Sequence, residues 1–163
     1  MKSLTAKDIM NEDVLAVGMN WSIDQLADYL IDNSISGAPV ISDEGNLIGV
    51  VSLTDIVRYK SIPATDALPE APHEFYIHSP ERQYSQAEVE SLHIDAESLI
   101  TVREIMTPMT FNVSEDTIIQ QVADAMIRGR IHRVFVTRNE MLAGIITTMD
   151  MLSVIRDLEV QNS

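Results

Sequence analysis

The segment Gly49-Val50-Val51-Ser52-Leu53-Thr54-Asp55 is an apolar, strand-forming run that ends in two hydroxyls and a carboxylate. The chain repeats it as Gly144-Ile145-Ile146-Thr147-Thr148-Met149-Asp150, with the glycine, the apolar pair, the hydroxyl and the acid at the same spacing. A strand of this kind, ending where an amphipathic helix begins, brings amide donors, a hydroxyl and a carboxylate close together. Nucleotides bind to groups of these types, so both segments are candidate ligand sites.

The same spacing also has a purely structural interpretation. Ser52 and Asp55 fit a helix capping box, in which the hydroxyl accepts a hydrogen bond from an orphan amide. The acid then also interacts favourably with the positive end of the helix dipole. Taken alone, the motif favours capping over ligand binding, and only its repetition strengthens the second interpretation.

The composition is that of a globular protein. A chain of 163 residues, 45% of them hydrophobic, can bury one sizeable core or two small ones. Residues 1–8 lack the apolar segment of a signal peptide, and no apolar run reaches the roughly 20 residues of a membrane span, so we expect a cytoplasmic protein. The absence of cysteine excludes disulfides and thiolate chemistry. A net charge of −14 disfavours nucleic acid and anionic membranes as partners.

An internal repeat appears when the sequence is shifted by 96 residues against itself. The apolar positions Ile23, Leu26, Ala27, Leu30 and Ile31 then fall on Ile119, Val122, Ala123, Met126 and Ile127. This spacing predicts a core-facing helix in each copy, with Asn20 and Asp116 as the N-cap residues. Each copy is predicted to fold as strand, helix, strand, turn, strand and helix, and such repeats usually form two similar units packed on each other.

The repeat divides the chain into three parts. Residues 1–60 form the first domain, 61–100 an insert and 101–163 the second domain. The insert holds four of the six prolines, and its eight acids and one base give it a net charge of −7. We expect it to be either partly disordered or an ordered flap, because it is too long for a plain loop.

Several motifs occur in the same order in both copies. They are the openings Asp8-Ile9-Met10-Asn11 and Glu104-Ile105-Met106-Thr107-Pro108, the segments Ser36-Gly37-Ala38-Pro39-Val40 and Ile131-His132-Arg133-Val134, and the two Gly-to-Asp endings. Together they resemble a tandem pair of cystathionine β-synthase (CBS) domains, a Bateman module. The resemblance covers roughly residues 5–60 and 101–158. It implies a stand-alone α/β module of two CBS-type repeats related by pseudo-two-fold symmetry.

The resemblance implies a regulatory module with an adenosine-containing ligand (AMP, ADP, ATP or S-adenosylmethionine) in clefts between the two domains, and no other cofactor. In the family, the aspartate of the ending holds the ribose hydroxyls and neighbouring hydroxyls reach the phosphate. One cleft would combine Ser52, Thr54 and Asp55 with His132 and Arg133, and the other would combine Thr147 and Asp150 with Gly37, Ala38, Pro39 and Asn20. Because Arg133 would face Asp55, a nucleotide is expected to bind first at the Asp55 cleft.

A cluster of basic residues supports the same expectation independently of the family. Arg128, Arg130, His132, Arg133 and Arg138 are five of the fifteen Lys, Arg and His residues of this acidic chain. The forked guanidinium group matches phosphate oxygens. A solvated surface is the other interpretation of such a cluster.

Three other functions compete with ligand sensing. The sequence has no G-x-S-x-G, H-E-x-x-H or P-loop motif, so we expect no enzyme activity. His73, His78 and His93 of the insert form a weak metal-ligand pattern. The third alternative is a ligand-free scaffold or protein-interaction module that works through the acidic insert.

A homodimer is predicted from the apolar helix faces. The residues concerned are Ile56, Val57, Met151, Leu152, Ile155 and Leu158. They cannot all be buried within one small chain, and symmetric self-association is the commonest way to cover such faces. The other expected partner is the protein that the module regulates, whose identity the sequence does not specify.

Overall fold

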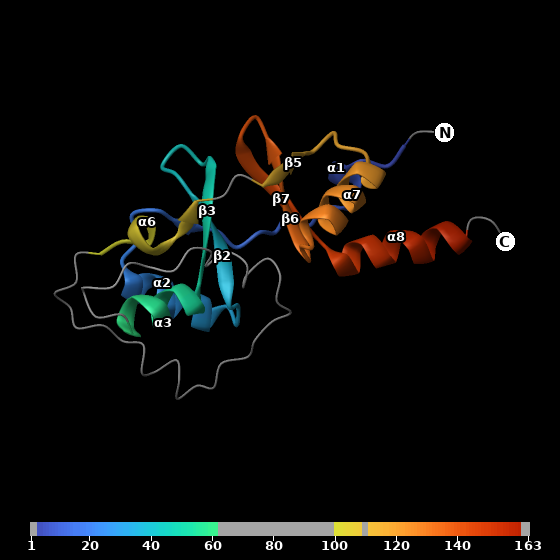
Figure 1. Ribbon diagram of the computed structural model, residues 1–163. Coiled ribbons are helices and arrows are strands. Elements are labelled where there is room, and N and C mark those ends of the chain that lie inside the picture. Colours follow the sequence, from blue (N-terminus) through green and yellow to red (C-terminus); the bar gives the residue numbers. More distant parts are fainter. Residues whose placement is uncertain (1–2, 62–99, 109–110, 161–163) are drawn as a thin grey trace. The chain divides into compact units, whose positions relative to one another are not determined.

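The computed structural model describes residues 3–61, 100–108 and 111–160 (Figure 1). In chain order the elements are α1 (Ala6–Ile9), β1 (Val17–Gly18), α2 (Ile23–Asp32), β2 (Gly37–Ile41), β3 (Leu47–Ser52), α3 (Leu53–Ser61), α6 (Val102–Ile105), β4 (Thr107–Pro108), β5 (Asn112–Ser114), α7 (Ile119–Gly129), β6 (Arg133–Arg138), β7 (Met141–Thr147) and α8 (Thr148–Val160). The predicted α/β fold with two strand-helix-strand repeats is confirmed. The predicted insert lies almost entirely outside the described residues.

The chain forms two compact units, and each contains parts of both sequence copies. Unit 1 comprises residues 1–14 and 111–163, and unit 2 comprises residues 15–110. The opening of the first copy, around Asp8–Asn11, therefore belongs to the same unit as the body of the second copy. The opening of the second copy, around Glu104–Pro108, belongs to the same unit as the body of the first copy. The domain boundaries of the repeat thus differ from those of the compact units, because the openings are exchanged.

Unit 2 is built on a four-stranded sheet in the order β1-β2-β3-β4. β1 runs parallel to β2, whereas β2–β3 and β3–β4 are antiparallel. The helices α2 and α3 lie together beside β2 and β3 (Figure 1). Their apolar side chains pack with one face of the sheet in a core that includes Leu26, Leu30, Val40, Val51 and Ile56.

Unit 1 is built on a three-stranded sheet in the order β5-β6-β7, with β5 parallel to β6 and β6 antiparallel to β7. Its core combines Ala6 of α1, Val122 and Met126 of α7, and Val134, Val136 and Ile146 of the sheet. The opening is held to this unit by backbone hydrogen bonds from Ala6 N to Thr117 O (2.8 Å) and from Lys7 N to Glu115 O (2.9 Å).

The helix starts differ from the predicted ones. Ser22, not Asn20, caps α2: its hydroxyl accepts from Gln25 N at 3.1 Å, and the Gln25 side chain accepts from Ser22 N at 3.0 Å. The physical reason is that Ser22 and Gln25 complete a reciprocal capping box two residues later. Asp116 is not a cap either, because α7 begins after Ile118.

Two short helices, α1 and α6, were not predicted as helices. Each follows a threonine that forms a capping box with an acid three residues later, Thr5 with Asp8 and Thr101 with Glu104. This spacing is visible in the sequence and could have revealed both helices. Their four-residue length is too short for the apolar periodicity by which the longer helices were found.

Gly49 and Gly144, which begin the two repeated segments, leave room for the exchanged openings. A Cβ at Gly49 would lie 2.6 Å from the backbone oxygen of Thr107, which belongs to β4. A Cβ at Gly144 would lie 2.7 Å from the Met10 sulfur and 3.0 Å from the Asn11 backbone oxygen. The glycines therefore permit each opening to pair closely with the ending of the other copy.

We predict that Gly49→Ala destabilises the protein by about 1 to 3 kcal/mol, because the new methyl group meets a backbone oxygen in a paired strand. Gly144→Ala should cost less, since its shortest contact is with the flexible Met10 side chain. Denaturant unfolding of both variants tests the order. Equal losses, or a larger loss for Gly144→Ala, would show that the β4 contact is not the tighter one.

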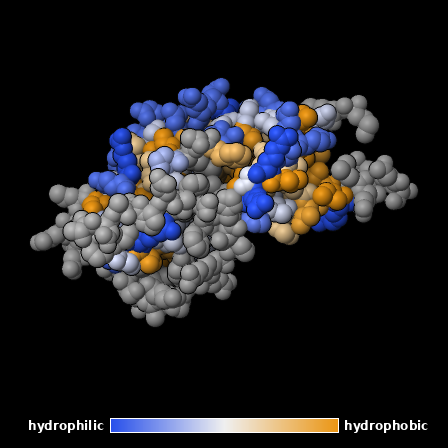
Figure 2. Space-filling view, in the orientation of Figure 1, coloured by the Kyte–Doolittle hydropathy of each residue, from blue (hydrophilic) through white to orange (hydrophobic). Residues whose placement is uncertain are grey.

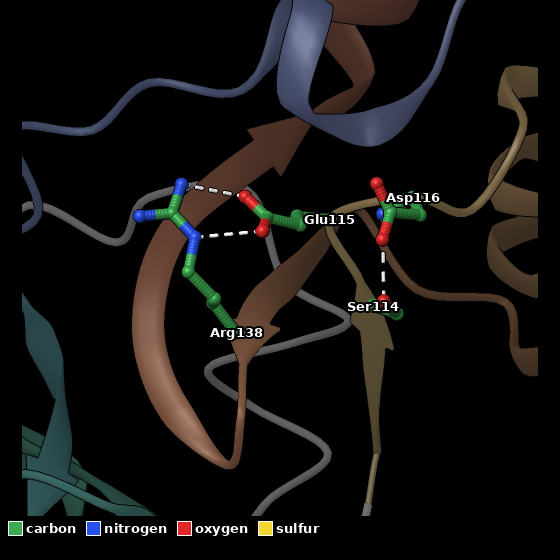
Figure 3. A network of polar contacts seen from close by, with 4 residues as sticks. All are labelled: Ser114, Glu115, Asp116 and Arg138. Carbon is green, nitrogen blue, oxygen red and sulfur yellow. Dashed lines mark hydrogen bonds and ion pairs between the residues drawn. The ribbon is translucent and has the colours of Figure 1, made fainter.

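An ion pair joins the residue that follows β5 to the last residue of β6 in unit 1 (Figure 3). Arg138 donates from Nε and Nη2 to the two carboxylate oxygens of Glu115, at 2.6 and 2.5 Å. Beside it, Asp116 N donates to the Ser114 hydroxyl at 3.4 Å. The Arg138 hydrogen bonds lower the pKa of Glu115 below its ordinary value of 4.5.

This lowered pKa predicts a pH dependence. The folded protein holds Glu115 ionised more strongly than the unfolded chain does, so the stabilisation is complete above pH 4.5 and is lost as pH falls through the lowered pKa. Wild-type protein should therefore lose more stability than Glu115→Gln between pH 5 and pH 3, about the range in which Glu titrates. Parallel losses in urea titrations at both pH values would exclude a contribution from this pair.

Candidate functional site

The first repeated segment forms a capping box at the start of α3. Asp55 Oδ2 accepts from Ser52 N at 2.7 Å and from Ser52 Oγ at 3.0 Å, and Asp55 N donates to Ser52 Oγ at 3.4 Å. The structural interpretation of this motif is thus realised. Among the described residues, these hydrogen bonds use only Oδ2, so Oδ1 is available to a further donor.

The second segment has the same geometry at the start of α8. Asp150 Oδ2 accepts from Thr147 N at 2.7 Å and from Thr147 Oγ1 at 2.8 Å, and Asp150 N donates to Thr147 Oγ1 at 3.4 Å. Within the described part of the chain, Oδ1 of this carboxylate is likewise not used by the cap. Both units therefore place a carboxylate oxygen and the amino terminus of a helix at the end of a strand.

The two carboxylates differ in burial. Asp55 is only 7% exposed, and burial raises its pKa although the hydrogen bonds from Ser52 and the charge of Arg58 act in the opposite direction. Asp150 is half-buried. Burial has removed water from the Asp55 carboxylate. A hydroxyl or cationic donor that binds Oδ1 would supply a hydrogen bond in place of that water.

The sheet register determines which predicted site residues lie together. Gly37 pairs with Ser52 across β2 and β3, and Arg133 pairs with Thr147 across β6 and β7. Within each unit, the first residue of the middle strand therefore lies beside the strand end of its own copy. The physical reason is that each antiparallel hairpin brings the beginning of one strand next to the end of the other. The predicted sets, which combine residues of the two copies, stay a prediction.

His132 is attached to the same strand end in unit 1. Its backbone oxygen accepts from Thr148 N at 3.0 Å and from Thr148 Oγ1 at 3.2 Å, while its side chain is exposed. Thr148 is the first residue of α8. Unit 1 thus brings together Arg133, His132, Thr147 and Asp150, four of the predicted site residues.

The remaining predicted residues lie in unit 2. Ala38 is fully buried in the core beneath the helices, so its side chain is a core group. Pro39 is buried on the opposite face of β2, since successive strand residues alternate. Asn20 donates to both carboxylate oxygens of Asp43 at 3.2 Å, in the loop beyond β1. Thr54 is half-buried in the first turn of α3.

Thr107 is a candidate that the sequence interpretation missed. It pairs with Val50 on β3, which pairs in turn with Pro39 on β2, so the three side chains form a row across the sheet. Its buried Oγ1 has no hydrogen-bond partner. A buried hydroxyl in that state calls for an external partner such as water or a ligand. The opening motif was visible in the sequence, but its pairing with β3 was not.

Helix α8 carries a second candidate surface. Met149, Leu152 and Ile155 are 69%, 51% and 57% exposed, and Figure 2 shows hydrophobic surface over this part of unit 1. Ile56, by contrast, is fully buried in the core of unit 2, so its predicted role in a dimer interface is wrong. The physical reason is that Ile56 lies on the sheet-facing side of α3. The Leu158 side chain lies outside the described residues.

Two other kinds of site, a membrane span and a metal centre, are absent from residues 3–61, 100–108 and 111–160. These ranges contain no helix with the length and apolar character needed to cross a bilayer. They also contain no group of three or more His, Cys, Asp or Glu side chains arranged to hold a metal ion. The histidines of the metal alternative, His73, His78 and His93, lie outside the described residues.

The chain is similar to known proteins both in sequence and in structure. The sequence model of the CBS domain matches residues 6–62 and 102–157. The uncharacterized protein MJ1426 of Methanocaldococcus jannaschii is 29% identical over 150 residues, which are 90% of this chain and 88% of that protein. The uncharacterized protein MJ1404 of the same organism is 26% identical over 98% of this chain, but the chain spans only 34% of its length.

Solved structures show the same fold. CBSX2 in complex with AMP has a TM-score of 0.64 at 22% identity, covering 95% of this chain and 98% of that one. The CBS domain pair of protein MJ0100, in complex with 5'-methylthioadenosine and S-adenosyl-L-methionine, has a TM-score of 0.60 at 22% identity, covering 96% and 98%.

Proposed function

Because this chain belongs to the CBS domain family, we propose that it is a regulatory module, not an enzyme, and that it binds an adenosine-containing ligand. The proposed ligand is AMP, ADP, ATP or S-adenosylmethionine, and the proposed positions are the two capping boxes at the ends of β3 and β7. Adenosine compounds bound to the similar folds of CBSX2 and the MJ0100 domain pair support this choice of ligand class.

The arrangement in unit 1 is the observation that carries the proposal. Asp150 Oδ1 would accept hydrogen bonds from the ribose hydroxyls, since Oδ2 is held by Thr147. Arg133, on the neighbouring strand beside Thr147, would supply positive charge for phosphate oxygens. The amino terminus of the 13-residue helix α8 adds its dipole to the same region.

This arrangement changes the expected order of the two positions. The sequence favoured Asp55 because Arg133 was expected to face it. Arg133 is also the strand neighbour of Thr147, while Gly37 takes the equivalent place beside Ser52. We therefore propose that a phosphorylated ligand binds first at Asp150, with Thr147 and Arg133.

We predict that Asp150→Ala and Arg133→Gln each weaken AMP binding by about ten- to a hundred-fold, because each removes a charge-assisted hydrogen bond. Arg128→Gln is the matched control, since Arg128 is an exposed arginine of the same unit that pairs with Asp124. Calorimetric titration measures all three variants. Raising the salt concentration should weaken AMP binding of the wild type more than that of Arg133→Gln.

The same titrations separate the alternatives. Stronger losses from Asp55→Ala than from Asp150→Ala would restore the order expected from the sequence. If AMP, ATP and S-adenosylmethionine neither bind to the wild type nor raise its melting temperature, the hypothesis of an adenosine-containing ligand fails. The scaffold alternative, acting through the acidic insert, would then be favoured.

We also propose that the chain is a homodimer, formed through α8. The exposed side chains of Met149, Leu152 and Ile155 give this helix an apolar surface that symmetric pairing would cover. The proposed location of the module and of the protein that it regulates is the cytoplasm. Nucleic acid and membranes are not proposed as partners, because the net charge of −14 opposes both.

Light scattering tests the dimer. The wild type should have twice the mass of one 18.2 kDa chain at micromolar concentration. Ile155→Asp should shift the protein to the monomer, because it would bury a charge in the interface. Leu15→Asp, which alters a 40% exposed residue outside α8, should not. A monomeric wild type, or a dimeric Ile155→Asp variant, would contradict the proposed interface.

A further inference from the structure

The opening of the first copy, residues 4–11, is a separate structural element of unit 1. This segment, the first opening, packs in unit 1, whereas the chain that follows it enters unit 2 at residue 15. Its helix α1 has only four residues, and a helix of that length is not stable on its own. The first opening is therefore ordered by its contacts with the rest of unit 1.

The contacts of the first opening are few and lie mainly on its backbone. Ala6 is its one fully buried side chain, and Ile9 and Met10 pack partly buried against the same core. At its end, Asn11 and Ile145 exchange both backbone hydrogen bonds, at 2.9 and 3.0 Å. A segment held in this way can detach as a unit while the rest of the domain stays folded.

The first opening covers the outer side of β7. In the three-stranded sheet β7 is an edge strand, and Asn11 forms an antiparallel bridge to it at Ile145. The strand Met141–Thr147 contains no charged residue and no proline. An uncovered edge of this composition is prone to pair with other chains. The docked and detached forms of the first opening thus present different surfaces at β7.

The strand β7 ends at the proposed ligand position. Ile145 lies two residues before Thr147, whose backbone N–H and hydroxyl donate to Asp150. Arg133 pairs with Thr147 from the neighbouring strand β6. With the first opening docked, β7 is held by β6 on one side and by Asn11 on the other. Detachment would leave this strand, and the groups at its end, supported from one side only.

We propose that docking of the first opening regulates ligand binding at Asp150. A ligand at this position stabilises the docked form, and detachment of the first opening weakens the binding of the ligand. The proposal rests on the proposed function. The first opening acts through β7 as a positioning element. Because such coupling is reciprocal, docking raises the affinity for the ligand by the same factor by which the ligand favours docking.

Hydrogen exchange of single backbone amides tests the coupling. In the ligand-free protein, the amides of Asn11 and Ile145 should exchange faster than those in the centre of β6, because detachment requires less free energy than global unfolding. AMP at about 100 times its dissociation constant should slow their exchange by about ten- to a hundred-fold. In Arg133→Gln, which keeps the capping box but is predicted to bind AMP more weakly, the slowing at the same AMP concentration should be about ten-fold smaller.

The reciprocal effect is measured by calorimetric titration with AMP. Asp8→Ala removes the capping box of α1, so it should favour the detached form and weaken AMP binding by about two- to ten-fold. Glu104→Ala is the matched control, because it removes the corresponding capping box of α6 in unit 2. It should bind AMP as the wild type does.

A disulfide that locks the first opening separates regulation from general damage to the fold. The chain has no cysteine of its own, so Asn11→Cys with Ile145→Cys introduces a single pair, at positions whose backbones are already bonded to each other. In the Asp8→Ala background, oxidation of this pair should restore the AMP affinity of the wild type. Reduction should remove that gain.

Three results would overturn the inference. They are exchange of the Asn11 and Ile145 amides no faster than in the centre of β6, AMP binding that leaves their exchange unchanged, and a locked Asp8→Ala variant that does not regain AMP affinity. Equal losses of AMP affinity in Asp8→Ala and Glu104→Ala would indicate a structural role only and would also overturn it. If the wild type binds no AMP in the calorimeter, the proposed function itself fails.

Discussion

The close approach of each opening to the glycine of the other copy is the contact on which both units depend. β4 reaches Gly49 only because no side chain separates the glycine from the Thr107 backbone oxygen. In unit 1, Met10 and Asn11 occupy the equivalent space beside Gly144. Each sheet is therefore completed by a segment from the other end of the repeat. Each unit of this fold therefore contains residues of both copies.

Capping and ligand binding are not exclusive roles for the repeated aspartates. A carboxylate has two oxygens, and the capping boxes of Asp55 and Asp150 use one of them. The cap fixes the rotamer of the side chain and so holds the second oxygen in place at the helix start. A ligand that meets such an oxygen does not have to order the side chain, and the entropic cost of binding is lower. The structural role thus prepares the functional one.

The sequence predicted those features that depend on local periodicity. The helical stripes located α2 and α7, and the glycine-to-aspartate segments located β3, β7 and the helices that follow them. The exchange of the openings was not predicted, because periodicity describes which face of an element is buried and not which copy buries it. The same limit placed Ile56 at a surface, although its side chain faces the core of unit 2.

The candidate site residues stay a prediction, but the sequence shows their types more directly than their neighbours in the fold. Asp55, Asp150 and their hydroxyl partners follow from spacing alone. The neighbours of Arg133 and Gly37 depend on hairpin register, and in both hairpins that register shifts at an irregularity, between Val40 and Ile41 and between Val136 and Thr137. A one-residue difference in pairing changes which side chains lie together. This detail comes from tertiary packing.

The positions of the arginines show which parts of the site the fold constrains. The aspartate is required at the same place in both copies, because it caps a helix as well as offering an oxygen to a ligand. The charge near it is not repeated: Arg133 stands on β6 beside Thr147, whereas Gly37 takes that place beside Ser52. The ribose-binding part of the proposed sites would then be shared by the two units, while the positive charge beside the strand end differs between them.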